Sequence, residues 1–323
     1  MDEILVIAEH RQGILRDITH EMLFKADQLR KSTSCAVTVL LIGGLDETTL
    51  KELSRRADKV LLLEQESLKN FNPDSYKETI FRLIQERQPF MTLIGHTSWG
   101  MGYAPALSVK TGYPFATDCI DILVENRRPL VIRQMYGGKV FSKVSFKESK
   151  GYILTVRPGA FPPPESVEDR HGEILPLPIP ADLPRPRSTF LELVDTGAGE
   201  LDITQADLLV SIGRGVGDEE NIATVKGLAD LMGGTLACSR PIVDKNWLPK
   251  FRQVGTSGKS VRPKVYLALG ISGAFQHIAG ISGAGTVIAV NKDRKAPIFR
   301  VADFGVVEDL FKVLEAMKEK LAK

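Results

Sequence analysis

The sequence is poor in cysteine, with only three among its 323 residues. Cys35, Cys119 and Cys238 lie far apart and form no CxxC pair. Zinc and iron–sulfur sites need clustered thiolates, so both are disfavoured, as is a framework of disulfides. A chain without disulfides suits a reducing compartment, and we therefore expect a cytoplasmic location.

Long apolar runs and a large charge of one sign are also lacking. No stretch of about eighteen apolar residues is present, and the acidic, strand-like N-terminus has neither the basic nor the apolar region of a signal peptide. The formal net charge is only +2, without a local run of Lys and Arg. We therefore expect neither direct membrane insertion nor nucleic-acid binding.

Motifs of common enzyme classes are missing as well. The sequence contains no GxSxG and no HExxH pattern, and His10, His20 and His96 stand at no metal-ligand spacing with a carboxylate or thiol. The Gly-x-Gly at 213–215 is followed by Asp218 where a GxGxxG fingerprint requires its third glycine. We expect no metal site and no hydrolytic site.

What the sequence does contain is an alternation of strand-like and helical segments, and its length suggests two domains. Between residues 4 and 111, the alternation predicts a parallel sheet with helices on both faces. Four strand-like segments between residues 119 and 157, with a turn at Gly137-Gly138, predict an antiparallel extension. Frequent prolines in residues 161–188 predict an extended linker, so we assign an N-terminal α/β domain to 1–188 and a C-terminal domain to 189–323.

The alternation resumes in the C-terminal domain. Expected strands lie at 208–212, 235–238, 265–269, 286–290 and 299–302, with a further edge strand at 190–194. Expected helices lie at 221–232, at 274–281, and along an apolar stripe from Val307 to Leu321. This order predicts a doubly wound α/β domain over residues 207–321.

Glycines and small polar residues follow several of these strands. They are Gly213-Arg214-Gly215, Ser239-Arg240, Gly270-Ile271-Ser272-Gly273 and Asn291. Such residues let backbone amides approach a phosphate, and in parallel sheets the strand ends meet at one edge. Any one loop is equally well explained as a tight turn, but together the loops favour a dinucleotide site.

Three other features of this domain are open to two interpretations. Arg214 and Arg240 are either surface arginines or partners of a phosphate or an electron-rich ring. His277 is either structural or a donor to a ring carbonyl that gains charge on reduction. Residues 253–259 form either a plain surface loop or a ligand-binding one. In the N-terminal domain, the strand-end loops at 8–10 and 95–98 look like a former nucleotide-binding edge, but we favour a packing surface.

The motifs of the last third of the chain form one long joint pattern. In chain order they are Gly213-Arg214-Gly215, Ser239-Arg240-Pro241, Gln253-Val254-Gly255-x-Ser257-Gly258-Lys259, Pro263-x-x-Tyr266-x-Ala268-x-Gly270-Ile271-Ser272-Gly273-Ala274-x-Gln276-His277, Ile288-Ala289-Val290-Asn291-Lys292-Asp293 and Ala296-Pro297-Ile298-Phe299-x-Val301-Ala302-Asp303-Phe304-Gly305. In order and spacing this pattern resembles the C-terminal half of electron transfer flavoprotein alpha subunits. The N-terminal half resembles the same family more weakly.

The resemblance implies a heterodimer with an electron transfer flavoprotein beta subunit and one FAD held mainly by the C-terminal domain. It also implies an electron carrier between flavin dehydrogenases and a membrane quinone oxidoreductase, of the kind that serves fatty acid β-oxidation. An electron-bifurcating, NADH-oxidising flavoprotein is the main alternative. A non-redox nucleotide-binding subunit on the same fold is a third.

Carried over by position, the resemblance implies a set of FAD-binding residues. They are Arg214, Ser239, Arg240, Gln253, Val254, Gly255, Thr256, Ser257, Ser272, Gly273, Ala274, Phe275, Gln276, His277, Asn291, Asp309 and Leu310. Arg240, Ser257 and His277 would tune the flavin, from above the ring, near N5 and at the pyrimidine carbonyl respectively. Many relatives have Thr in place of Ser257 and Gln in place of Thr256, so we expect the hydroxyl contact to persist and the side-chain role of Thr256 to be lost.

Overall fold

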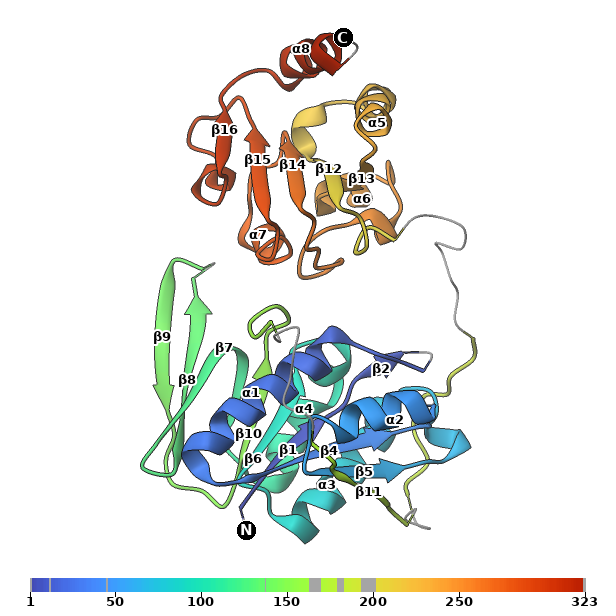
Figure 1. Cartoon of the computed structure of the whole chain (residues 1–323), viewed down its shortest axis with the longest axis vertical. Helices are drawn as coiled ribbons and strands as arrows, with labels where there is room; N and C mark the ends of the chain where they lie inside the picture. The colour runs from blue at the N-terminus through green and yellow to red at the C-terminus, as the bar shows by residue number, and fades with distance from the viewer. Residues whose placement is uncertain are drawn as a thin grey trace. The chain divides into compact units, whose positions relative to one another are not determined.

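The computed structural model describes residues 2–11, 13–44, 46–136, 138–162, 170–178, 183–192 and 202–321. The chain divides into two compact units, residues 1–192 and 193–323 (Figure 1). Each unit encloses its own apolar clusters on the two faces of its own sheet. The two units are therefore described in turn.

A mixed sheet forms the centre of the N-terminal unit. Its described strands are β1 (Glu3–Ile7), β4 (Ala36–Ile42), β5 (Lys59–Leu63), β6 (Met91–Gly95), β7 (Phe115–Glu125), β8 (Arg128–Met135), β9 (Val140–Ser145), β10 (Tyr152–Val156) and β11 (Glu173–Pro176). They lie in the order β11-β5-β4-β1-β6-β10-β7-β8-β9. The two short strands β2 (His10–Arg11) and β3 (Ile14–Leu15) form a separate antiparallel pair.

Helices cover both faces of this sheet, as the alternation predicts. They are α1 (Asp17–Thr33), α2 (Glu47–Ser54), α3 (Pro73–Arg87) and α4 (Ser98–Thr111), with a 3₁₀ turn η1 at Glu66–Leu68. α1 and α2 pack on one face, and α3 and α4 on the other. Asp46 caps α2 as expected, because its carboxylate accepts a hydrogen bond from the Thr49 amide at 2.7 Å.

The expected antiparallel extension is only partly right. β7, β8 and β9 pair antiparallel, whereas β10 lies between β6 and β7 and pairs parallel with both. Every residue of β10 is buried, as expected for an inner strand covered on both faces. The predicted turn residue Gly137 lies outside the described part, and its neighbour Gly138 donates its amide hydrogen to the Met135 carbonyl.

The proline-rich segment is not a plain linker. Its described portion contains β11, which adds to the edge of the sheet beside β5 in parallel. Proline is tolerated there because an edge strand can spare backbone donors, so the prediction of no regular structure was wrong. The prolines at 163, 164 and 180 lie outside the described residues. Of the expected strand at 190–194, residues 190–192 are not a strand and the rest is not described.

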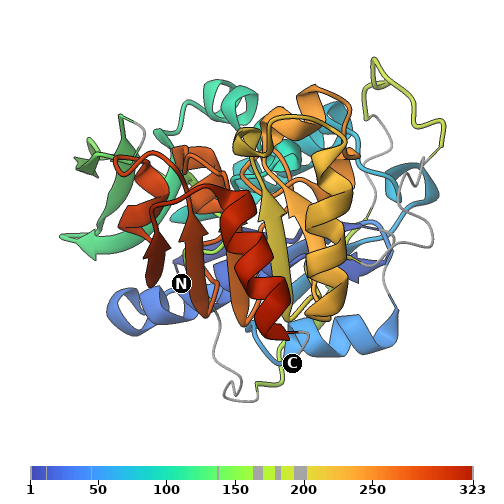
Figure 2. The ribbon, with the colours of Figure 1, turned by 90° about the horizontal axis from the view of Figure 1, so that it is seen from above.

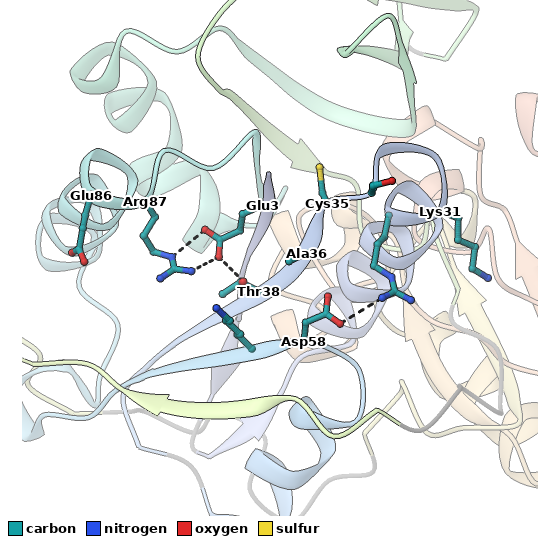
Figure 3. Close-up of a pocket in the computed structure, with 11 residues that line it drawn as sticks. Glu3, Lys31, Cys35, Ala36, Thr38, Asp58, Glu86 and Arg87 are labelled. Carbon is teal, nitrogen blue, oxygen red and sulfur yellow. Dashed lines mark hydrogen bonds and ion pairs between the residues drawn. The ribbon is translucent and has the colours of Figure 1, made fainter. Parts of the chain in front are cut away.

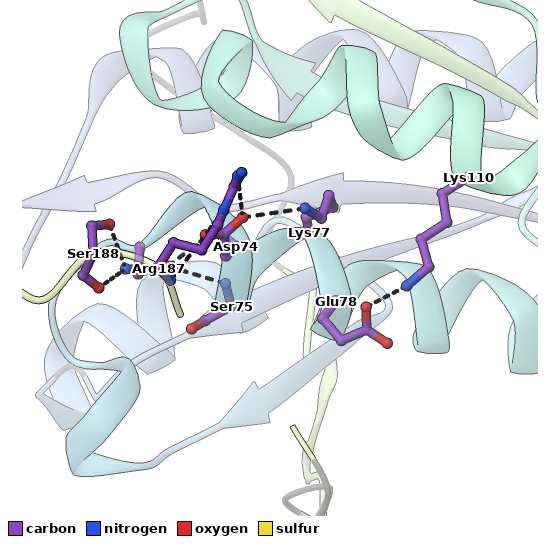
Figure 4. A network of polar contacts seen from close by, with 8 residues as sticks. Asp74, Ser75, Lys77, Glu78, Lys110, Arg187 and Ser188 are labelled. Carbon is purple, nitrogen blue, oxygen red and sulfur yellow. Dashed lines mark hydrogen bonds and ion pairs between the residues drawn. The ribbon is translucent and has the colours of Figure 1, made fainter. Parts of the chain in front are cut away.

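The described end of this segment, residues 183–192, is tied to the start of α3 (Figure 4). Arg187 donates hydrogen bonds to the Asp74 carboxylate from Nε at 3.1 Å and from Nη2 at 3.0 Å. Asn72 donates to the Ser188 carbonyl at 2.9 Å while its own oxygen caps α3. Hence the first turn of α3 serves also as an anchor for the segment.

The C-terminal unit contains a fully parallel sheet. Its described strands are β12 (Leu208–Ile212), β13 (Thr235–Cys238), β14 (Val265–Leu269), β15 (Thr286–Val290) and β16 (Phe304–Val306), in the order β13-β12-β14-β15-β16. The described helices are α5 (Asn221–Leu231), α6 (Arg240–Asp244), α7 (Phe275–Ala279) and α8 (Leu310–Leu321), with 3₁₀ turns η2 (Arg214–Val216), η3 (Lys250–Arg252) and η4 (Pro297–Arg300).

α5 and α8 run side by side over one face of this sheet (Figure 2), and α7 with the longer loops covers the other. The predicted doubly wound fold is confirmed. The expected strand at 299–302 was wrong, because Pro297 begins a 3₁₀ turn there and the edge strand comes later, as β16. Val307, placed in the last helix by the apolar pattern, is half exposed and precedes it.

Candidate functional site

A cavity of about 660 Å³ opens at the carboxyl ends of β12, β13 and β14. The chain passes from β12 to one neighbour, β13, and then returns to the other neighbour, β14. In open parallel sheets, ligands bind at such a reversal, outside the carboxyl ends of the strands. This is the edge at which the sequence predicts a ligand site.

Most of the predicted site residues line this cavity. They are Arg214, Ser239, Arg240, Gln253, Val254, Gly255, Thr256, Ser257, Ser272, Ala274, Gln276, His277 and Asn291. Gly273, Phe275, Asp309 and Leu310 lie outside its lining. Leu310 is buried in the core, and the Asp309 carboxylate accepts from the Phe311 amide and pairs with Lys292 at 2.6 Å.

The glycines after β12 and β14 let these two loops touch. A side chain on Gly215 would lie 2.7 Å from the Gly270 α-carbon, and the Gly215 amide donates to the Gly270 carbonyl at 3.0 Å. Gly270 itself has φ of +64°. The close packing of the two loops therefore explains why glycine is required at these positions. Gly215 and Gly270 also contribute backbone atoms to the cavity wall.

The loop at 253–259 is held at both ends. The Val254 amide donates to the Cys238 carbonyl at 2.8 Å, and the Thr256 amide donates to the Gln276 carbonyl at 2.9 Å. Buried Gln253 donates from Nε2 to the Ser257 hydroxyl oxygen at 2.8 Å. Since that oxygen accepts from Gln253, the Ser257 hydroxyl hydrogen stays available to a ligand.

Arg240 is the first residue of α6, and its side chain is 68% exposed. Its Nε lies 3.4 Å from a carboxylate oxygen of Asp244, one turn later on the same helix. Such an exposed pair holds the guanidinium only weakly. Both side chains line the cavity, so the arginine is free to reorient toward a ligand.

His277, in contrast, is buried in the wall. Nδ1 lies 3.1 Å from the Val254 carbonyl oxygen, and Nε2 lies 2.8 Å from the Tyr266 hydroxyl. Burial lowers the pKa of His277 to about 4, opposed by the Val254 carbonyl. The imidazole is therefore neutral at pH 7, and both of its nitrogens already have protein partners.

Several cavity residues were not among the FAD-binding residues that the resemblance implies. They are Gly215, Pro241, Asp244, Gly270, Ile271, Asp293, Ala296 and Pro297. Gly215, Gly270 and Ile271 do belong to the strand-end loops that predict a dinucleotide site. Asp244 had a detectable signal, because a carboxylate four residues after an arginine on a helix lies on the same face. Ala296 and Pro297 belong to the joint motif, but only the three-dimensional structure brings them next to the Gly270 loop.

A second cavity, of about 860 Å³, lies in the N-terminal unit (Figure 3). It opens at the amino ends of β1, β4 and β5, opposite the edge where parallel sheets bind ligands. Figure 3 shows Arg87 and Thr38 both directed at the Glu3 carboxylate, with hydrogen bonds of 3.0 Å from Arg87 Nε and 2.5 Å from Thr38. Because Glu3 pairs with Arg87 and Asp58 with Arg30, and because the cavity lies at the amino ends of the strands, we do not assign a ligand to it.

The carboxyl edge of the N-terminal sheet is filled by its own side chains. The Thr97 hydroxyl donates to Glu9 at 2.7 Å, His10 Nε2 lies 2.7 Å from the Ile42 carbonyl, and Trp99 stacks on Phe71 at 4.3 Å. Burial raises the pKa of Glu9. These contacts are typical of a packing surface.

Two further features concern the ranges of the chain that the structure describes. His, Cys, Asp and Glu side chains form no group of three or more there that could hold a metal ion. The helices of the same ranges include none that is long and apolar enough to cross a bilayer.

Comparisons with known proteins cover both units. A family model described as "Electron transfer flavoprotein domain" matches residues 4–181, and one described as "Electron transfer flavoprotein FAD-binding domain" matches residues 202–282. The chain is 40% identical over 324 residues to "Electron transfer flavoprotein subunit alpha" of Methylophilus methylotrophus, covering 100% of both chains.

Of two further relatives, one has the same name and the other a different one. "Electron transfer flavoprotein subunit alpha" of Clostridium acetobutylicum is 37% identical over 316 residues, covering 96% of this chain and 94% of the relative. "Lactate dehydrogenase (NAD(+),ferredoxin) subunit LctC" of Acetobacterium woodii is 31% identical over 313 residues, covering 96% of this chain and 75% of the relative.

Proposed function

The chain belongs to the electron transfer flavoprotein alpha-subunit family, and from that premise we propose that it is the flavin-carrying half of a heterodimeric electron carrier. Its FAD-binding domain makes FAD the cofactor. The family implies a beta subunit as partner. We propose that flavin dehydrogenases supply the electrons and that a membrane quinone oxidoreductase accepts them.

The C-terminal cavity fits a flavin dinucleotide in size and in chemistry. Its volume of about 660 Å³ lies inside the range of roughly 300–1,000 Å³ typical of ligand pockets. Gly215 and Gly270 expose backbone at the mouth, and Arg214 adds a cation that suits a phosphate. We propose that these groups hold the pyrophosphate part of FAD.

FAD supplies the redox chemistry, since it takes up and releases electrons. We propose that Arg240 lies over the flavin ring, where its positive charge favours the reduced, negatively charged form. Ser257 keeps a hydroxyl hydrogen to donate to the ring edge. His277 forms a neutral wall beside it. Asp309 and Leu310 lie outside the cavity lining, so for them we propose support of α8 rather than contact.

The observation that carries this proposal is the grouping of Arg240, Ser257 and His277 around one cavity of the FAD-binding domain. The chain should be co-expressed with its beta subunit and the purified complex examined for flavin. We expect flavin absorbance between the near-ultraviolet and the blue, release of FAD on denaturation, and reduction of the bound flavin by a flavin dehydrogenase. A complex without FAD would contradict the proposal.

The second candidate is an electron-bifurcating, NADH-oxidising complex. The relative named as a subunit of an NAD(+),ferredoxin lactate dehydrogenase supports keeping it. Bifurcation would need a second FAD in the beta subunit, so this chain alone does not distinguish a bifurcating complex from a simple carrier. Counting bound FAD and AMP per heterodimer, together with an NADH oxidation assay, separates the two: one FAD and no NADH oxidation indicate the simple carrier.

A further inference from the structure

A buried chain of polar groups runs from the cavity wall into the C-terminal core. His277 lines the cavity but is only 6% exposed, and its Nε2 contacts the hydroxyl of Tyr266, which is fully buried on β14. Ser211 follows on the adjacent strand β12 and is also fully buried. The three side chains connect the ligand cavity to the centre of the sheet.

The hydrogen positions in this chain follow from its partners. A carbonyl oxygen only accepts, so Nδ1 of His277, which lies 3.1 Å from the Val254 carbonyl, carries a hydrogen. In a neutral imidazole Nε2 then accepts, and the Tyr266 hydroxyl, 2.8 Å away, is the donor. In this state Nε2 has no hydrogen to offer to a ligand.

Ser211 is the unexplained member. Its hydroxyl makes no hydrogen bond among the described residues, although it is near enough to the Tyr266 hydroxyl to oppose the rise of the Tyr266 pKa on burial. A buried hydroxyl without a partner costs stability, and a small apolar residue would avoid that cost. A serine hydroxyl can donate to the Tyr266 oxygen or accept from the Tyr266 hydroxyl, so Ser211 can serve Tyr266 in either orientation of the tyrosine hydrogen.

We propose that Tyr266 and Ser211 are positioning residues that let His277 take up a proton at Nε2 when the ligand in the cavity becomes negatively charged. The Tyr266 hydrogen turns from His277 to Ser211, and the new Nε2–H donates to the Tyr266 oxygen. Nδ1–H keeps its bond to the Val254 carbonyl, so the ring does not move. Every polar group in the chain then has a partner.

The charges balance over the cycle. Bound FAD would supply one net negative charge once its redox partner has reduced it, and one proton from solvent would enter the imidazole, so the net charge of the site would be unchanged. This inference rests on the proposed function, since it needs a ligand that gains negative charge. The charged side chains that line the cavity are Arg214, Arg240, Asp244 and Asp293, and none of them is a cause of the low pKa of resting His277.

The test follows the ring nitrogens of His277 by ¹⁵N NMR in the complete complex with its beta subunit and FAD. His277→Gln identifies the signals. In the oxidised complex at pH 7 we expect hydrogen on Nδ1 only. After full reduction with dithionite we expect hydrogen on both nitrogens, a shift of the pKa from about 4 to above 7 and so a gain in proton affinity of roughly a thousandfold.

Ser211→Ala tests the role of Ser211 separately, because Val254 and Tyr266 set the resting tautomer of His277 without it. We expect this variant to bind FAD and to keep Nδ1–H when oxidised, but to lose proton uptake on reduction; Tyr266→Phe loses it too. Ser211→Thr keeps a hydroxyl and should restore uptake. Thr92→Val, which removes an equally buried and unpaired hydroxyl from the other unit, should behave as wild type.

Two outcomes overturn the inference. If His277 stays neutral in the reduced wild-type complex, the proposed proton uptake is wrong. If Ser211→Ala takes up the proton normally, the proposed role of Ser211 is wrong. Either result leaves the proposed function standing as long as FAD is bound and reducible. Absence of FAD from the complex would instead contradict the proposed function first.

Discussion

At the scale of single residues, the cavity brings together one mobile charge and one buried neutral ring. Arg240 is largely exposed and pairs with Asp244, whereas His277 is fixed by two hydrogen bonds. An exposed guanidinium keeps its charge in any environment, so it acts on a ligand through its position. An imidazole acts through its protonation, which burial controls.

Arg240→Ala should lower the reduction potential of the bound FAD. Removing a positive charge near the ring destabilises the reduced, negatively charged form by about 1 kcal/mol, on the order of 50 mV for one electron. Spectroelectrochemical titration of the purified complex measures this shift. Lys250→Ala removes an equal charge from η3, outside the cavity lining, and should leave the potential unchanged. A potential unchanged in Arg240→Ala would favour a non-redox role.

The pH dependence of stability should report the burial of His277. Because its folded pKa of about 4 lies below the unfolded value of about 6.5, its contribution to stability is complete above pH 6.5 and falls as the pH drops toward 4. The loss is on the order of 3 kcal/mol. Urea unfolding at several pH values measures this loss of stability. The experiment uses a Trp99→Phe background, so that the fluorescence of Trp247 reports on the C-terminal unit. In His277→Gln this loss should largely disappear; an equal loss there would assign it to other groups.

At the scale of elements, the loop at 253–259 depends on one backbone conformation. Gly255 has φ of +136°, and a side chain there would lie 2.9 Å from the Gln276 carbonyl oxygen that the Thr256 amide needs. The loop and the start of α7 are therefore locked together at that carbonyl. Ser257 and His277 belong to these two elements, so their separation depends on Gly255.

Gly255→Ala should weaken FAD binding by about 5- to 150-fold, since a strain of roughly 1–3 kcal/mol displaces the loop. Isothermal titration of the FAD-depleted complex with FAD measures the change. The matched control is Gly227→Ala, in the interior of α5, where an added side chain meets nothing within 4 Å. That variant should keep its affinity and gain about 0.5–1 kcal/mol of stability. Wild-type affinity in Gly255→Ala would mean that the loop does not shape the site.

The anchor at the start of α3 should govern access to residues 183–192. Trypsin cleaves after Arg187 but not after Arg185, because Pro186 follows the latter. Asp74 holds the Arg187 side chain through two hydrogen bonds, and this contact keeps the pKa of Asp74 well below its usual range. Asp74→Asn should therefore speed cleavage after Arg187 several-fold, as mass spectrometry of a digestion time course would show.

The same experiment on wild type should show cleavage rising as the pH falls below about 4, because protonated Asp74 loses the ion pair; an acid-stable Arg-specific protease is needed there. Asp46→Asn changes an exposed carboxylate that caps α2 and makes no contact with Arg187, so it should have no effect. Equal cleavage rates in all three proteins would show that the ion pair does not restrain the segment.

Local patterns predicted most elements but not the ones that depend on distant partners. The buried runs at 4–8 and 208–212 identified β1 and β12 because parallel inner strands are apolar on both faces. β10 is also a buried apolar run. Its place between β6 and β7, however, requires the chain to come back from β9 into the sheet, and no local pattern predicts that. β11 was hidden for a different reason, because an edge strand tolerates the prolines that otherwise indicate a linker.

The site was predictable to a similar extent. Glycine and polar residues after each strand identified its edge, and the family pattern supplied the individual residues. Neither indicated that Nε2 of His277 is occupied by Tyr266, since that contact depends on the depth of the ring in the wall. Nor did they indicate that Leu310 lies outside the cavity lining, where it packs in the apolar core of the C-terminal unit.

At the scale of the whole molecule, the described apolar clusters divide cleanly between the two units. The cavity assigned to FAD is lined only by residues of the C-terminal unit, whereas the carboxyl edge of the N-terminal sheet is filled by its own side chains. A ligand that binds one folded unit stabilises that unit by mass action. Its effect should therefore be confined to the C-terminal unit, apart from surfaces that meet the partner.

Hydrogen–deuterium exchange on the complex, with and without FAD, tests this division. Removing FAD should speed exchange in the loops at 253–259 and 270–277, because their amides and side chains lose the ligand they surround. Peptides that contain β4 in the centre of the N-terminal sheet should exchange at the same rate in both samples, since that strand is buried between its own helices. Faster exchange in β4 without FAD would mean that the two units fold as one cooperative structure, and the separate treatment of their stabilities would then be wrong.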